Sequence, residues 1–215
     1  MSGNDAQATF YFDTISPFAY LMWRALRRAP LAKPFKAVPV VFGALLNHWG
    51  QLGPAEIGPK RLHTYRYCQW LADREGIRFR FPPAHPFRSL DSLRLIVALG
   101  STETAVDGVF GAIFGEGMDA ASPEGLARIG ERLGVADVPA LIASTGAAAR
   151  LRDNTEGAIS QGVFGVPTLA VDGELFWGFD TLPMAIDYLA DPALFESDEM
   201  RRIADLPVGI VRRKG

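Results

Sequence analysis

Ser16 is the residue of this sequence whose position most clearly suits chemistry. It follows a run of β-branched and aromatic residues, 8–14, and precedes Pro17, a residue favoured in the first turn of a helix. A serine hydroxyl at that position can cap the helix by accepting a backbone N–H. It can also donate its hydrogen to an anion at the positive end of the helix dipole, and a thiolate is such an anion. Position alone favours the cap.

A second motif lies far along the chain, where Val166 and Pro167 begin an expected strand. A proline at the start of a strand is either an edge residue or cis. The peptide group of Val166 could then pair with the backbone of an extended peptide ligand, as an added strand would. A plain Gly-Val-Pro turn is the alternative.

A third motif opens the last expected helix. Asp180 or Thr181 occupies the cap position, and Pro183 lies in the first turn. The amides of this turn could bind a carboxylate and the Asp180 side chain an ammonium group, and a γ-glutamyl terminus carries both. Ordinary capping explains the same residues, so this motif alone is a weak signal.

The composition is that of an ordinary globular protein, with 215 residues, 48% hydrophobic, and a formal net charge of −2. The charge argues against nucleic acid as the main partner, and the basic end at residues 212–214 is typical of a solvated tail. No run approaches the roughly 20 apolar residues of a membrane helix, and the N-terminus does not resemble a secretory signal. We therefore expect a cytoplasmic protein with no membrane partner.

The cysteine content limits redox and metal chemistry. Cys68 is the single cysteine, so no internal disulfide can form, and one cysteine with three histidines shows no zinc-binding spacing. We expect no metal site. Cys68 lies in a helical pattern, which favours a buried small hydrophobic residue over a reactive thiol.

The elements that must position these motifs form two groups at the ends of the chain. The first is a strand at 8–14, a helix at 17–28 and a strand at 36–42, a β-α-β unit that places Ser16 at the carboxyl end of the sheet. Open α/β sheets bind ligands at that end. The second group is a strand at 165–171, a turn at Asp172 and Gly173, a strand at 174–177 and a helix at 182–189. Between the groups we predict helices at 60–75, 89–99, 103–115, 123–133 and 138–160.

This order predicts an α/β protein with a thioredoxin-like fold, a βαβ and a ββα unit in one sheet, carrying a large all-helical insertion. We expect a discontinuous thioredoxin-like domain at 8–46 and 160–215 and a helical insertion domain at 47–159. In such a fold Pro167 would face the first helix, which favours anion binding by Ser16. The place of a redox Cys-x-x-Cys motif is held by Ser16-Pro-Phe-Ala, so no sulfur is present there for thiol-disulfide exchange.

Three stretches together resemble a known family. Residues 10–21 read Phe-Tyr-Phe-Asp-x-x-Ser-Pro-Phe-x-Tyr-Leu, residues 162–168 read Gly-Val-Phe-Gly-Val-Pro-Thr, and residues 176–180 read Phe-Trp-Gly-x-Asp. This combination resembles the 2-hydroxychromene-2-carboxylate isomerase family, relatives of the kappa-class glutathione transferases. The resemblance runs from about residue 9 to residue 190.

The resemblance implies a glutathione-dependent enzyme. Ser16 would be the catalytic residue and hold the cofactor sulfur, while Val166 and cis-Pro167 would pair with the cofactor backbone. The residues implied for its γ-glutamyl end are Phe179, Asp180 and Thr181. The family's reaction interconverts a 2-hydroxychromene-2-carboxylate-like hemiketal and an open-chain arylidene pyruvate by reversible addition of the thiolate.

The substrate side rests on two loops rich in glycine and proline. The first, residues 43–60, resembles the family's cleft and supplies the candidates Asn47, His48, Trp49 and Gln51. The second, residues 81–90, supplies His85 and Arg88. Arg88 could pair with a substrate carboxylate, although a solvated arginine and a packed pair of His48 and Trp49 are the alternatives. Many relatives carry asparagine in place of Arg88, which leaves the substrate open.

Three functions follow from these residues. The first is the isomerase, acting on a small aromatic acid. The second is a kappa-like transferase that conjugates electrophiles with glutathione. The third is a non-catalytic thioredoxin-like module that binds a peptide at the Val166–Pro167 edge. The resemblance also makes a homodimer an expectation.

Overall fold

The computed structural model of the protein describes residues 8–29, 31 and 34–211. The basic end at 212–214 lies outside this part of the chain. The N-terminal unit consists of β1 (Ala8–Phe12), α1 (Pro17–Leu26) and β2 (Phe35–Pro39), and β1 pairs in parallel with β2, Phe10 opposite Ala37. The predicted β-α-β unit is confirmed, with Ser16 between the end of β1 and the start of α1.

The C-terminal unit completes the sheet. β3 (Thr168–Val171) and β4 (Glu174–Trp177) form a hairpin whose turn residues Asp172 and Gly173 both have positive φ, and α9 (Leu182–Ala190) follows. β3 pairs antiparallel with β1, Phe10 opposite Leu169, so the strand order is β2-β1-β3-β4. The predicted thioredoxin-like α/β fold with inserted helices is confirmed.

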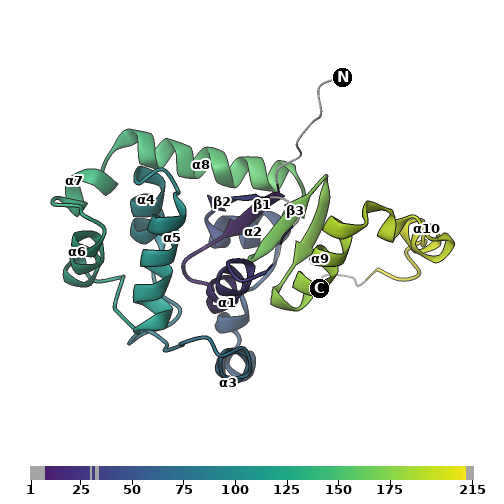
Figure 1. Ribbon diagram of the computed structural model, residues 1–215, viewed down its shortest axis with the longest axis horizontal. Coiled ribbons are helices and arrows are strands. Elements are labelled where there is room, and N and C mark those ends of the chain that lie inside the picture. The colour runs from purple at the N-terminus through teal and green to yellow at the C-terminus, as the bar shows by residue number, and fades with distance from the viewer. Residues whose placement is uncertain (1–7, 30, 32–33, 212–215) are drawn as a thin grey trace.

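The segment between β2 and β3 is almost wholly helical. It contains α2 (Phe42–Trp49), the 3-10 turn η1 (Pro54–Glu56), α3 (Gly58–Arg74), α4 (Leu90–Ala98), α5 (Glu103–Phe110), the π turn η2 (Gly111–Gly115), α6 (Pro123–Arg132), α7 (Val138–Ile142) and α8 (Thr145–Ser160). After β4 come the 3-10 turn η3 (Phe179–Thr181), α9, the 3-10 turn η4 (Pro192–Phe195) and α10 (Asp198–Ala204), which projects from the body (Figure 1).

Two sequence predictions about these helices are wrong. Residues 138–160 form two helices, because the Ser144 hydroxyl accepts the Ala147 N–H and caps a new helix there. Residues 43–51 form most of helix α2 instead of a loop. That helix buries Leu45 and Leu46 and ends where Gly50 takes a left-handed φ of 63°.

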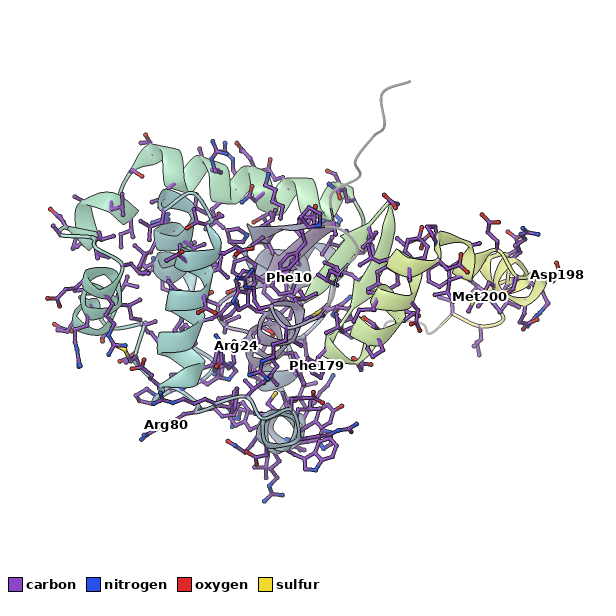
Figure 2. All side chains as sticks on the ribbon, viewed as in Figure 1. Phe10, Arg24, Arg80, Phe179, Asp198 and Met200 are labelled. Carbon is purple, nitrogen blue, oxygen red and sulfur yellow. The ribbon has the colours of Figure 1, made fainter. Side chains whose placement is uncertain are left out.

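The sheet has helices on both faces, and β1 shows why. Phe10 and Phe12 are buried in a large core cluster with α1, the middle helices and α9, whereas Tyr11 points to a second cluster with α2 and α8. Figure 1 shows α8 lying along one side of the sheet, and Figure 2 shows Phe10 deep between the layers. The proposed domain boundaries at 46/47 and 159/160 remain a prediction. Helix α8, which lies in the proposed insertion domain, packs against β2 of the sheet.

No helix in the described part of the chain is long and apolar enough to cross a membrane.

Candidate active site

A cavity of about 490 Å³ opens at the carboxyl end of β1, where α1 begins. Most of its lining is apolar, and Ser16 and Val166 both contribute to it, although they are far apart in the sequence. The tertiary structure therefore brings together the first two predicted motifs.

The Ser16 hydroxyl is already the cap of α1. Ser16 has extended backbone geometry, and its Oγ accepts the Ala19 N–H at 3.2 Å. The residue is 7% exposed. A hydroxyl that accepts one hydrogen bond still carries a hydrogen to donate, and within the described residues no acceptor takes the hydrogen of Ser16. The cap and the anion-donor roles are thus compatible.

Ser122 provides an internal comparison, because it is also followed by proline and also caps a helix. Its Oγ accepts the Gly125 N–H at 3.1 Å, but its own hydrogen is donated to the Asp119 carbonyl oxygen at 3.3 Å. Two Ser-Pro caps of similar local geometry therefore differ in one respect. Within the described residues the Ser16 hydroxyl, beside a cavity, has no acceptor for its hydrogen, whereas the Ser122 hydroxyl donates to a carbonyl oxygen of the same chain.

Asp13 is a buried carboxylate in the cavity lining that the sequence analysis missed. Its two oxygens accept the Ile15 N–H at 2.9 Å and the Phe42 N–H at 2.8 Å, and Ser89 also bonds to it. Burial raises the pKa of Asp13 to about 6, and these three hydrogen bonds oppose the rise. The available signal was an acidic residue at the end of a buried strand, three positions before Ser16.

His85 lines the cavity, yet both of its ring nitrogens bond to the protein. Nε2 lies 2.7 Å from the Ile15 carbonyl oxygen, and Nδ1 lies 2.8 Å from the Tyr65 hydroxyl. Burial lowers the pKa of His85 below its usual value. His85, which the sequence predicted as a substrate-binding residue, thus forms hydrogen bonds to Tyr65 and to the turn before Ser16.

The second motif has the predicted geometry. The Val166–Pro167 peptide bond is cis, and the Pro167 carbonyl oxygen accepts the Gly178 N–H at 2.9 Å. Gly165 is required just before it, because a Cβ there would lie 2.5 Å from Nε1 of Trp177.

The third motif lies beside the first. η3 packs against α1, Phe179 packs on the main core, and the Thr181 hydroxyl donates to the Gly178 carbonyl oxygen at 3.1 Å. Asp180 is exposed. None of these three residues, nor Pro167, lines the 490 Å³ cavity, so their part in cofactor binding remains a prediction.

The candidate substrate residues on α2 do not line the cavity. Asn47, His48, Trp49 and Gln51 are exposed, and the Trp49 indole donates to the Val163 carbonyl oxygen at 3.0 Å. His48 packs edge-on against Trp49 at 4.9 Å between ring centroids, the packed pair considered as the alternative. Phe42, Gly43 and Leu46 of the same helix line the cavity instead, whereas the four candidates lie in the last turn of α2 or just after it.

Arg88 is a cavity residue. Its side chain is 69% exposed and lies 3.7 Å from an Asp91 carboxylate oxygen. A pair that exposed is weak, so the guanidinium can turn to an incoming carboxylate at small cost.

Cys68 is buried in α3, and burial raises the pKa of its thiol far above its usual range. The prediction of a buried cysteine is confirmed. Within the described residues no group of three or more His, Cys, Asp or Glu side chains could hold a metal ion.

Comparison with known proteins places this architecture in a family. Residues 7–190 match the model of the DSBA-like thioredoxin domain. The chain belongs to the DSBA-like thioredoxin domain family. Relatives within this family carry the names that the sequence motifs suggested.

Three similar proteins illustrate this. A 2-hydroxychromene-2-carboxylate isomerase of Pseudomonas sp. (strain C18) is 30% identical, covering 81% of this chain and 86% of its own. Glutathione S-transferase kappa 2 of Caenorhabditis elegans is 27% identical, covering 85% of this chain and 91% of its own. A solved structure of 2-hydroxychromene-2-carboxylate isomerase superposes with a TM-score of 0.75 at 26% identity, covering 94% of this chain and 99% of that one.

Proposed function

We propose that this protein is a glutathione-dependent isomerase acting on a 2-hydroxychromene-2-carboxylate-like aromatic acid. The observation that carries the proposal is the Ser16 hydroxyl, which caps α1, lines an apolar cavity and has no acceptor for its hydrogen among the described residues. The names of the similar isomerases support the same reaction class.

The residues present suit the tripeptide. The cavity is large enough for a thiol-bearing side chain with an aromatic partner, and Val166 on its wall precedes the cis-proline whose backbone would align an extended peptide. When bound, glutathione would supply a thiol sulfur as the nucleophile for reversible addition to the substrate.

The chain's own groups would act on the charge of that sulfur and on the substrate. Ser16 would donate a hydrogen bond to the thiolate, and the positive end of the α1 dipole would stabilise the same charge. Together they would lower the pKa of the bound thiol towards neutrality. The apolar cavity wall excludes water from the reacting atoms and strengthens both effects. Arg88 at the cavity rim would bind the substrate carboxylate.

The experiment that tests this proposal compares two serine variants by ultraviolet difference spectroscopy with glutathione across pH. Ser16→Ala should raise the pKa of the bound thiol and lower turnover by about 10²-fold or more, the loss expected for one anion-stabilising donor. Ser122→Ala is the matched control, since it also removes a Ser-Pro cap but lies away from the cavity. A wild-type protein with no thiolate signal, or an unchanged Ser16→Ala variant, would refute the proposal.

A kappa-like glutathione transferase is the second candidate, favoured by the similarity to the kappa 2 transferase. The same thiolate site would serve both reactions, so the product distinguishes them. Liquid chromatography coupled to mass spectrometry should show a new peak of unchanged mass for the isomerase, and a thioether with the added mass of glutathione for the transferase. Glutathione binding without turnover of either kind would instead support a non-catalytic binding module.

A homodimer and a cytoplasmic location complete the proposal. Both come from the resemblance and the composition. Sedimentation of the purified chain over a concentration range tests the first, and a single species at monomer mass would contradict it.

A further inference from the structure

The peptide group between Ile15 and Ser16 is held at both of its ends. Its N–H donates to the Asp13 carbonyl oxygen at 3.0 Å, and its C=O accepts from His85 Nε2 at 2.7 Å. A carbonyl oxygen only accepts, so Nε2 must carry the hydrogen. The next peptide group is held as well, because the Ser16 carbonyl oxygen accepts the Ala19 and Tyr20 N–H groups at 3.1 and 3.2 Å. With the peptide groups on both sides held, the direction of the Ser16 Cα–Cβ bond is fixed.

The imidazole is held in turn by a residue of α3. The Tyr65 hydroxyl lies 2.8 Å from His85 Nδ1 and 2.5 Å from the His85 carbonyl oxygen, and it donates its single hydrogen to one of these two atoms. The rings of Tyr65, Phe81 and Phe114 surround the imidazole edge-on, with centroids 5.2, 5.5 and 6.2 Å away. Neither the ring plane nor its position is therefore free to change.

We propose that His85 and Tyr65 are positioning residues for Ser16, an inference that rests on the proposed thiolate site. Tyr65 orients His85, His85 fixes the Ile15 carbonyl, and the turn then aims the Ser16 hydroxyl at the bound sulfur. Because Nε2 gives its hydrogen to the Ile15 carbonyl oxygen, the neutral imidazole has no N–H left to donate to a substrate. The inserted helices thus complete the thiolate site, because both positioning residues come from the segment between β2 and β3.

A pair of His85 variants separates this role from simple packing. His85→Gln keeps an N–H close to the position of Nε2, whereas His85→Met has similar bulk but no donor. We expect His85→Met to raise the pKa of bound glutathione and to lower kcat about 10- to 100-fold, the loss expected from a small misplacement of a reacting group. His85→Gln should retain most of the activity. Cofactor Kd measured at a pH well below the pKa of the bound thiol should change little in either variant, because the peptide-pairing edge at Val166 is untouched.

Two further variants complete the test. Tyr65→Phe removes only the hydroxyl and should shift the thiol pKa in the same direction by less. His63→Met on α3 is the control, since His63 is exposed and lies outside the cavity lining, and it should behave as wild type.

The outcomes distinguish the two proposals. If Ser16→Ala changes the thiol pKa but His85→Met and Tyr65→Phe leave it unchanged, the positioning role is overturned while the thiolate site stands. A His85→Gln variant as impaired as His85→Met also overturns it. If Ser16→Ala itself matches wild type, the thiolate site is wrong. Should His85→Met fail to fold, as judged by circular dichroism, Tyr65→Phe decides the question alone.

Discussion

At the scale of single residues, the site depends on what each polar group still has to offer after folding. The oxygen of Ser16 is used by the helix and its hydrogen is not, while both nitrogens of His85 are used. Ser16 therefore suits chemistry and His85 suits support. Residue type alone would rank them the other way, because histidine is the commoner acid-base group.

Asp13 carries a prediction about pH. Its folded pKa of about 6 exceeds the usual 3.8, so the folded state binds the proton more tightly than the unfolded state does. The stability that this group contributes is complete below about pH 4 and is lost as pH rises through about 6. Asp13→Asn should therefore flatten the dependence of the free energy of unfolding on pH over this window. Urea melts from pH 4 to pH 7 measure it.

The control for Asp13 is Glu174→Gln, an exposed carboxylate on β4. Subtracting the wild-type curve of unfolding free energy against pH from the Asp13→Asn curve isolates the contribution of Asp13 from that of the other titrating groups. Parallel curves for the two proteins would contradict the raised pKa.

Asp180 carries a prediction about cofactor affinity. Asp180→Ala should weaken glutathione binding by about 1 to 3 kcal/mol, the range for a hydrogen bond to a charged group, with little change of kcat at saturating cofactor. Calorimetry gives the affinity. Asp187→Ala, another exposed aspartate nearby on α9, is the control. An unchanged affinity for Asp180→Ala would remove this residue from the site.

At the scale of elements, the hairpin of β3 and β4 sets the position of the Val166 edge. The indole of Trp177 packs directly against the backbone at Gly165, and a Cβ on residue 165 would collide with it. The edge that would pair with a peptide ligand is thus located by a contact within the hairpin and not by the proline alone.

Gly165→Ala should therefore damage both stability and binding. Overpacking of this kind costs about 1 to 3 kcal/mol, and the displaced Val166 should weaken glutathione binding as well. Gly157→Ala on α8 is the control, because a Cβ there meets open space in a helix and should stabilise by about 0.5 to 1 kcal/mol. Thermal melts and calorimetry measure both effects. A Gly165→Ala protein that binds as well as wild type would contradict this view of the edge.

At the scale of the whole molecule, the main core crosses the boundary between the sheet and the inserted helices. Phe110 of α5 lies 5.3 Å from Phe12 of β1 and 6.0 Å from Tyr20 of α1, centroid to centroid, and is fully buried. Figure 2 shows Arg24 in the same region, where it forms an ion pair of 2.7 Å with Asp107 of α5. Sheet and helices therefore share the main core cluster.

This continuity predicts a single unfolding transition. Phe110→Ala should cost about 3 to 5 kcal/mol, as for other buried phenylalanines, and should lower the stability of sheet and helices together. Far-ultraviolet circular dichroism and tryptophan fluorescence should give coincident denaturation curves in the wild type and the variant. Two separated transitions would show that the inserted helices unfold independently.

The sequence by itself determined the β-α-β unit, the hairpin and the Ser-Pro helix start. Each follows from adjacent residues, because backbone geometry and capping depend on near neighbours. The helix at 42–49 escaped this reasoning, since its glycine and flanking prolines outweighed the buried Leu45 and Leu46. Only the tertiary structure placed Ser16 and Val166 at one cavity, and only it joined His85 to Ile15, 70 residues away. Such contacts depend on how distant segments pack, which no local pattern in the chain encodes.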